Sequence, residues 1–132
     1  MTESVNRMLA GDAASRALGI QVSEITAGAA TATMRIRPDM VNGHGITHGA
    51  FVFAVADTAF ACACNSHGPL TVAAAADIMF IAPSHAGDVL EARAVERTRF
   101  GRSGIYDVTV RRGDEVIAEF RGTSRTIERD PA

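Results

Sequence analysis

Residues 42–65 read NGHGITHGAFVFAVADTAFACACN, and this stretch decides the fold. After a loop with two histidines and several glycines, residues 50–65 are apolar nearly all round, which predicts a helix buried on all sides. His67-Gly68-Pro69 then ends the helix. The one charged residue within this helix is Asp57. The rest of the chain must therefore cover an apolar helix that carries a single carboxylate.

The remaining chain is predicted to be mainly strands. Ala32, Met34 and Ile36 alternate with polar residues, as a half-buried strand requires. The predicted elements are a helix over residues 5–18 and strands over residues 21–37, 71–82, 89–99, 104–111 and 115–127. Short turn-like connections between the later strands favour an antiparallel meander. We therefore predict one α+β domain over residues 1–132, in which a curved antiparallel sheet of about five strands wraps the central helix.

Composition excludes several classes of function. The chain has 132 residues, 21% of them charged, and a formal net charge of −2 with no basic block, so we expect no nucleic-acid partner. Its longest apolar run is short and is interrupted by Asp57, so we expect no membrane span. No signal peptide is recognised at the N-terminus, and Cys62 and Cys64 cannot pair along a helix. A reduced, cytoplasmic compartment is the expected location.

Asp57 has a structural and a catalytic interpretation, because an unpaired carboxylate in an apolar helix is costly. In the structural one it caps a backbone group or pairs with an arginine at a subunit contact. The catalytic one starts from His48-Gly49-Ala50, where the helix start offers backbone N–H groups to a negatively charged oxygen. The Asn42 loop adds side-chain donors. Acyl transfer needs donors that hold the carbonyl oxygen, and a carboxylate that either attacks the carbonyl carbon or activates a water molecule.

Helix geometry adds a constraint on this site. Gly49 and Asp57 are eight residues apart, so they lie about 12 Å from each other along one straight helix. A reacting carbonyl has to sit roughly 3 Å from both groups. If both serve one reaction, Gly49 must come from one subunit and Asp57 from its partner. An open sheet edge independently favours a dimer.

At these residues the sequence resembles the hotdog-fold acyl-CoA thioesterases of the phenylacetate-degradation (PaaI-like) type. The family segment N-G-x-x-x-x-H-G-G/A-x-x-x-x-x-A-D-x-A is matched in full by NGHGITHGAFVFAVADTA. The resemblance implies a hotdog fold, a homodimer with a continuous sheet and often a homotetramer. It implies hydrolysis of an acyl-CoA thioester, such as an aryl- or hydroxyphenylacetyl-CoA, with no cofactor beyond the coenzyme A of the substrate. Gly49 N–H and Asn42 would polarise the carbonyl, Asp57 of the facing subunit would be base or nucleophile, and His48 would shape the loop.

The sequence departs from the family at the strand after the helix, where many relatives carry a serine or threonine that orients water. Residues 72–77 read VAAAAD, without a hydroxyl at the centre. Thr58, Asp77 or an ordered water could replace it, or turnover could be weaker. We count Thr58 among the predicted substrate contacts.

The substrate needs space for its nucleotide and for its acyl group. For the phosphates of coenzyme A we predict the turn with Arg99, Gly101, Arg102 and Ser103, because arginine suits phosphate; a plain solvated hairpin is the alternative. The acyl group is expected between the paired helices. Its candidate contacts, some of which are expected to be ordinary core, are Phe51, Val52, Val55 and Phe60, and Met79 and Phe80 are predicted to be core residues.

Three other functions compete with hydrolysis. His44, His48 and Asp57 could be metal ligands, but the glycines between them disfavour the helix that would align them, so no metal is predicted. A hotdog-fold hydroxyacyl-CoA dehydratase could use His48 and Asp57 for proton transfer. A non-catalytic acyl-CoA binding module would keep the pocket without the chemistry.

Overall fold

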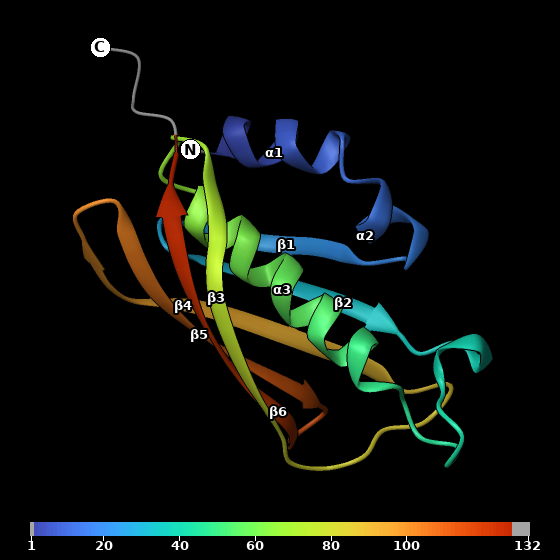
Figure 1. The fold of residues 1–132 in the computed structure, drawn as a ribbon. Coiled ribbons are helices and arrows are strands. Elements are labelled where there is room, and N and C mark those ends of the chain that lie inside the picture. Colours follow the sequence, from blue (N-terminus) through green and yellow to red (C-terminus); the bar gives the residue numbers. More distant parts are fainter. Residues whose placement is uncertain (1, 128–132) are drawn as a thin grey trace.

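The computed structural model describes residues 2–127, and it places one long helix in the hollow of a curved sheet (Figure 1). The predicted central helix is confirmed as α3 (Gly49–Asn65). Two short helices precede the sheet, α1 (Thr2–Ala10) and α2 (Ala13–Ala17), and a 3₁₀ turn (Pro38–Met40) leads toward α3. The six strands are β1 (Gln21–Thr26), β2 (Ala29–Arg35), β3 (Thr71–Phe80), β4 (Val89–Phe100), β5 (Ser103–Arg112) and β6 (Glu115–Thr126).

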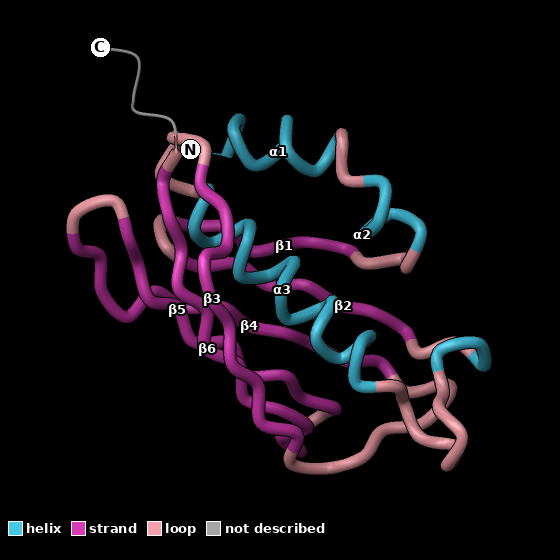
Figure 2. The backbone as a smooth tube through the Cα atoms, in the orientation of Figure 1, coloured by secondary structure: helices cyan, strands magenta, loops and turns pink. Residues whose placement is uncertain are grey.

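The sheet is antiparallel throughout, in the order β1-β2-β4-β5-β6-β3. Its curvature carries it around α3, so the helix crosses the inner face of the sheet (Figure 2). The last four strands were predicted to within two residues at each end. The sheet has six strands where about five were expected, because residues 21–37 turn back on themselves at Gly28, whose φ of 78° suits glycine.

The predicted N-terminal helix is also divided. It breaks at Gly11, and Asp12 begins the second piece as its N-cap by accepting the Ser15 N–H at 2.9 Å. Gly19, with φ of 71°, follows the end of α2, as expected for a helix stop. The break brings α2 back against α3, which a single straight helix over residues 5–18 would not do.

The core lies between α3 and the inner face of the sheet. Phe60 is almost fully buried, and its ring packs 5.6 Å from the Tyr106 ring and 5.7 Å from the Phe120 ring, centroid to centroid. Cys62 and Cys64 are buried free thiols on the same helix, and burial raises the pKa of each to about 12. These thiols therefore act as apolar packing groups rather than nucleophiles.

One face of α3 passes so close to the sheet that a glycine is required there. A Cβ on Gly122 of β6 would lie 2.7 Å from the Phe60 ring. Gly122→Ala is therefore expected to lower the free energy of unfolding by about 1–3 kcal/mol through overpacking. Urea denaturation measures this, with Gly43→Ala as control because nothing lies within 4 Å of a Cβ there. Equal stability of Gly122→Ala and the wild type would contradict the packing; adding Phe60→Leu should restore part of the loss.

The sheet edge at β3 and one stripe of α3 remain open in the single chain. Residues 72–77 of β3 are exposed in succession, so both faces of this edge strand are uncovered. Along α3 the half-buried residues Phe53, Ala54, Asp57 and Ala61 fall on one stripe, and Gly49 and Phe51 near the helix start are also half-buried. The expected burial of α3 on all sides is thus not achieved by its own chain. An open strand edge beside an apolar helix stripe is a surface suited to a second copy.

Candidate active site

The start of α3 presents a free backbone donor. His48 is the N-cap, and its Nδ1 accepts the Ala50 N–H at 3.0 Å, which puts the ring proton on Nε2. The His48 N–H donates to the Met40 carbonyl at 2.8 Å. No acceptor for the Gly49 N–H is found among residues 2–127. The helix therefore offers this one N–H, at the positive end of its dipole, to a ligand.

Asn42 belongs to a tight loop that fixes the orientation of its amide. Its Oδ1 accepts the His44 N–H at 2.9 Å and lies 3.4 Å from the Ile46 nitrogen. Its backbone N–H donates to the Ile46 carbonyl, and the loop turns at Gly45, which has a φ of 77°. Since the amide oxygen is engaged by the loop, the Asn42 NH₂ group is the part left to donate outward.

Gly49 and Asn42 line one cavity, as the sequence predicted for two donors of one site. This cavity has a volume of about 530 Å³, and Val52, Phe80 and Ile81 supply apolar walls. A space of this size with few polar groups suits a small organic group held by its carbonyl oxygen. Of the predicted acyl contacts, Val52 lies here, while Val55 and Phe60 are buried in the core and Phe51 packs edge-on against His48.

The prediction that Met79 and Phe80 belong to the core is wrong. Their exposed fractions are 66% and 53%, because they end the edge strand β3, which has a neighbouring strand on one side only within residues 2–127. The Phe80 ring instead lies over the helix start, 3.0 Å from where a Cβ of Gly49 would be. Phe80 was missed as a cavity residue because apolar character alone does not distinguish a core position from a binding surface.

Asp57 lies in the middle of α3, half-buried on the open stripe. No residue of the described range gives its carboxylate a hydrogen bond or an ion pair. Burial raises its pKa above the ordinary aspartate value, and the negative charge of Asp12 raises it further. Because Gly49 and Asp57 lie in one continuous helix, the predicted separation of about 12 Å within a chain stands.

Thr58 points away from the cavity. Its hydroxyl lies 2.9 Å from the Ser15 hydroxyl of α2, and both residues are buried. Asp77 is another candidate to replace the serine or threonine that relatives carry on the strand after the helix. It lines a separate hollow with Arg97, Asp107 and Arg121. Neither side chain reaches the Asn42 cavity of its own chain, so their contacts with substrate or water stay predictions.

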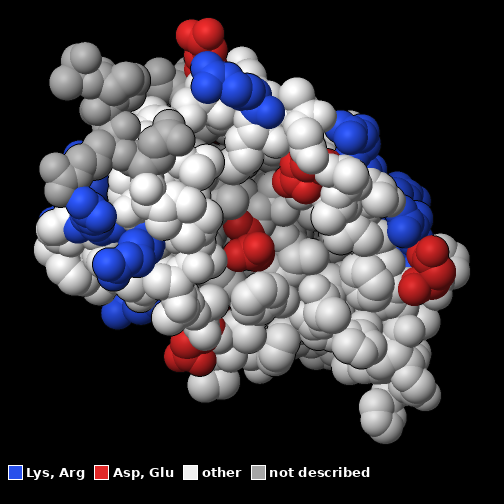
Figure 3. Space-filling view, turned by 45° about the horizontal axis from the view of Figure 1, so that its top comes forward, with Lys and Arg blue, Asp and Glu red and all other residues white. Residues whose placement is uncertain are grey.

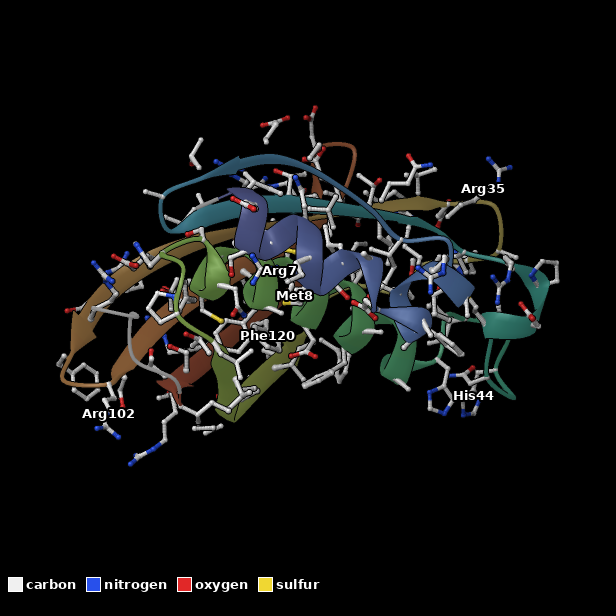
Figure 4. The ribbon with its side chains drawn as sticks, turned by 90° about the horizontal axis from the view of Figure 1, so that it is seen from above. Arg7, Met8, Arg35, His44, Arg102 and Phe120 are labelled. Atoms are coloured by element: carbon white, nitrogen blue, oxygen red, sulfur yellow. The ribbon has the colours of Figure 1, made fainter. Side chains whose placement is uncertain are left out.

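The predicted nucleotide site lies at the other end of the molecule. Arg99, Gly101, Arg102 and Ser103 surround a hollow of about 260 Å³ near the C-terminal end of α3. Figure 4 shows Arg102 and His44 at opposite ends of the molecule. On the face drawn in Figure 3, basic side chains lie at both ends and at the top, and some of the acidic side chains lie beside a central depression.

A half-buried hydrogen-bonded group lies beside the hollow near Arg102 and has no signature in the sequence. The Glu96 carboxylate accepts the Tyr106 hydroxyl at 3.0 Å and lies 2.7 Å from His67 Nε2. These bonds outweigh the desolvation of Glu96 and lower its pKa. The three residues come from β4, β5 and the segment after α3, and no sequence spacing connects them.

The histidines near Asp57 do not gather as metal ligands. His44 is exposed in the loop, and His48 Nδ1 is engaged by the helix cap. Within the described part of the chain, no three His, Cys, Asp or Glu side chains are placed to hold a metal ion. In that same part, no helix combines the length and apolar character needed to cross a membrane.

The fold and this arrangement have known counterparts. The family model described as "Thioesterase superfamily" matches residues 44–119, which include all of α3, strands β3 to β5 and the start of β6. The chain belongs to the thioesterase superfamily. This thioesterase is 41% identical over 126 residues to "Acyl-coenzyme A thioesterase PaaI" of Escherichia coli strain K12, covering 95% of the chain and 90% of the relative.

Solved structures agree with the sequence relatives. The thioesterase matches the structure of Escherichia coli PaaI, from the phenylacetic acid degradation operon, with a TM-score of 0.92 at 40% identity, covering 95% and 91% of the two chains. A mutant of the phenylacetic acid degradation protein PaaI from Thermus thermophilus matches with a TM-score of 0.83 at 37% identity, covering 86% and 97%. The predicted hotdog fold and the resemblance to PaaI-like thioesterases are confirmed.

Proposed function

We propose that this thioesterase hydrolyses an acyl-coenzyme A thioester to a free acid and coenzyme A. The observation that carries the proposal is that Gly49 and Asn42, each with a donor group left to bind a ligand, line the same largely apolar cavity. Two fixed donors at a cavity wall can bind the carbonyl oxygen of a thioester more tightly as it gains negative charge. The naming of the Escherichia coli relative as an acyl-coenzyme A thioesterase supports the substrate class.

Asp57 of the partner subunit is the proposed base or nucleophile. In a dimer joined along β3, a two-fold axis makes the two edge strands and the two α3 helices antiparallel. We infer a register in which the start of one helix faces the middle of the other, where Asp57 lies half-buried on the open stripe. The exposed residues 72–77 supply the edge for such a pairing. A tetramer would double this dimer without changing the site.

Two chemical routes remain for the Asp57 carboxylate. It attacks the carbonyl carbon and forms an anhydride with loss of the coenzyme A thiolate, or it takes a proton from a water that attacks instead. His48 contributes through the helix cap, which keeps the Gly49 N–H directed into the cavity. After single turnover in ¹⁸O-labelled water, label in the enzyme carboxylate identifies the first route, because water enters Asp57 when it opens the anhydride at the Asp57 carboxyl carbon.

The proposed nucleotide contacts are Arg99, Gly101, Arg102 and Ser103 of the subunit that supplies Asp57. Their hollow adjoins the C-terminal end of α3, and Asp57 is seven residues before Cys64, another of its lining residues. That separation is about 10 Å along the helix, whereas the cavity with Gly49 in the same subunit is at the opposite end. The extended coenzyme would thus cross the subunit boundary.

Arg102→Ala is expected to raise KM for an acyl-CoA roughly two- to fivefold, because an exposed ion pair contributes about 0.2–1 kcal/mol. Turnover should be unchanged, since the phosphates take no part in the bond change. The effect should shrink in high salt, which screens exposed charges. Steady-state kinetics test this, with the exposed Arg111→Ala as control. An unchanged KM in Arg102→Ala at low salt would show that the nucleotide of the substrate does not bind at this turn.

A panel of acyl-CoA substrates assayed for free thiol tests the proposed function. Aryl, arylacetyl and aliphatic acyl groups of increasing length should be included, and at least one should release thiol at a rate above the buffer. Binding of acyl-CoA without thiol release across the panel would make the chain a binding module. Loss of water from a hydroxyacyl-CoA without thiol release would instead make it a dehydratase.

A further inference from the structure

A chain of hydrogen bonds leads from α3 to a second carboxylate. The Asp12 Oδ2 atom accepts the Ser15 hydroxyl at 2.6 Å, and its Oδ1 atom accepts the Ser15 N–H at 2.9 Å. The Ser15 oxygen lies 2.9 Å from the Thr58 hydroxyl. Ser15 and Thr58 are both buried, so water does not compete freely for these bonds.

The donors in this chain can be assigned. An ionised carboxylate only accepts, so Ser15 gives its single hydroxyl proton to Asp12. The Ser15 oxygen is then free to accept, and Thr58 must be the donor between the two hydroxyls. Thr58 directly follows Asp57 in α3. The chain therefore fixes α2, and the charge at its N-cap, against the helix turn that carries the proposed base.

Asp12 acts on more than one position of that turn. Its charge raises the pKa of Asp57 and of Cys62, in each case after the larger effect of burial. Asp57 and Cys62 flank Thr58 along α3, and Thr58 and Cys62 share a face because they are four residues apart. The raised pKa values of Asp57 and Cys62, which precede and follow Thr58 in α3, agree with the position of Asp12 that the hydrogen bonds give.

Several other charged groups on the elements packed against α3 are engaged elsewhere. Arg7 and Glu3 pair with each other on α1, Arg16 bonds to the Ala10 carbonyl, and Glu96 bonds to His67 and Tyr106. Neither these groups nor the other charged side chains of the strands, such as Arg35 of β2 and Asp77 of β3, are among the causes that raise the pKa of Asp57. The titratable side chains on its own helix are Cys62 and Cys64. Asp12 is thus the charge from outside α3 that bears on Asp57 within the described residues.

We propose that Asp12 is a positioning residue for thioester hydrolysis: the Thr58–Ser15–Asp12 chain holds a second carboxylate beside Asp57 and so strengthens Asp57 as a base or nucleophile. The inference rests on the proposed role of Asp57. A negative neighbour makes a carboxylate bind a proton more tightly, and a base works best when its pKa approaches the working pH. Asp12 and Ser15 belong to the N-cap and body of α2, whereas many relatives carry a serine or threonine on the strand after the central helix.

Carboxyl NMR of the ¹³C-aspartate-labelled protein tests the inference without requiring turnover. The Asp57 signal is assigned by its absence from Asp57→Asn, and its titration is followed in the wild type and in Asp12→Asn. Asparagine is also a good N-cap, so α2 should persist while the charge is lost. We expect Asp57 to titrate at lower pH in Asp12→Asn, and the exposed Asp114→Asn to leave it unchanged. An Asp57 titration unmoved in Asp12→Asn overturns the inference.

Further variants test the bridge and guard against misfolding. Ser15→Ala keeps the Asp12 charge but cuts the chain, and should move the Asp57 titration in the same direction. Thr58→Ser keeps the hydroxyl, so Asp57 should titrate as in the wild type, whereas the Asp57 titration in Thr58→Val should follow that in Ser15→Ala. Asp12→Ser, a second uncharged N-cap, replaces Asp12→Asn if the latter does not fold. A wild-type titration in Ser15→Ala and Thr58→Val would overturn the bridging role.

Kinetics connect the charge to catalysis. The acidic limb of kcat/KM in Asp12→Asn should move to lower pH along with the NMR titration, and the plateau should fall several-fold as the base weakens. An NMR shift with an unmoved acidic limb overturns the positioning role. Absence of thiol release from the wild type overturns the proposed function instead, and the NMR result then still decides whether Asp12 acts on Asp57.

Discussion

Asp57→Asn is expected to lower kcat roughly 10²- to 10⁴-fold, the contribution of a positioned general base. KM should change little, because the carboxylate acts in the chemical step rather than in binding. The half-buried carboxylate has no partner among the described residues, so asparagine breaks no ion pair there. Stopped-flow thiol release with a good substrate measures the loss. Unchanged turnover in Asp57→Asn would remove this residue from the mechanism.

The same variant should not lose stability. Because the folded pKa of Asp57 is raised, the folded state binds its proton more tightly than the unfolded state does. Stability is therefore highest below the unfolded pKa and falls as pH rises through the folded pKa. At neutral pH the ionised Asp57 destabilises the fold, and asparagine removes that cost. We expect an equal or higher Tm for Asp57→Asn at neutral pH, which separates loss of chemistry from loss of folding. A lower Tm would contradict this pKa assignment.

Gly49→Pro is the second large effect expected, a loss of roughly 10²- to 10³-fold in kcat, which is typical for one donor to a developing oxyanion. Gly49 is the first residue of α3, where proline is well tolerated because that N–H has no helical partner. His48 already has the extended ψ of 133° that suits a residue before proline. The substitution thus removes a donor while the helix is kept.

Gly49→Ala is the matched control for this variant. It keeps the N–H but adds the Cβ that would lie 3.0 Å from the tip of the Phe80 ring. Since Phe80 is half-exposed, its ring can move aside. Alanine should therefore retain much of the activity that proline abolishes. Equal losses in both variants would assign the effect to crowding by Phe80 rather than to the missing donor.

Local patterns predicted the parts of the structure that depend on local physics. The apolar run of α3 and the turn residues between β3, β4, β5 and β6 give each element its place in the sequence. The proximity of Asn42 and Gly49 was also predicted, because a helix start and a small polar loop have recognisable residues, while their role as donors to a carbonyl stays a prediction. Their meeting in one cavity follows from a span of only seven residues.

The parts that failed depend on contacts distant in sequence. The sequence predicts one strand over residues 21–37 because the alternation over residues 31–37 was extended back past Gly28. In the structure the chain turns there, and the Gly28 N–H donates to the Ser66 hydroxyl at 2.8 Å. Phe80 was placed in the core because its apolar character is the same in a core and on a cavity wall. The Asp12–Ser15–Thr58 chain joins positions 43 residues apart, and no sequence pattern marks it.

The sharing of one site between two subunits is tested most directly with a heterodimer of Asp57→Asn and Gly49→Pro chains, isolated through two different tags. Each homodimer lacks one group in both of its sites and should be nearly inactive. The heterodimer holds one site with both groups intact, so it should recover about half of the wild-type turnover per dimer. A verified heterodimer as inactive as its parents would show that Gly49 and Asp57 do not act together across the subunit boundary.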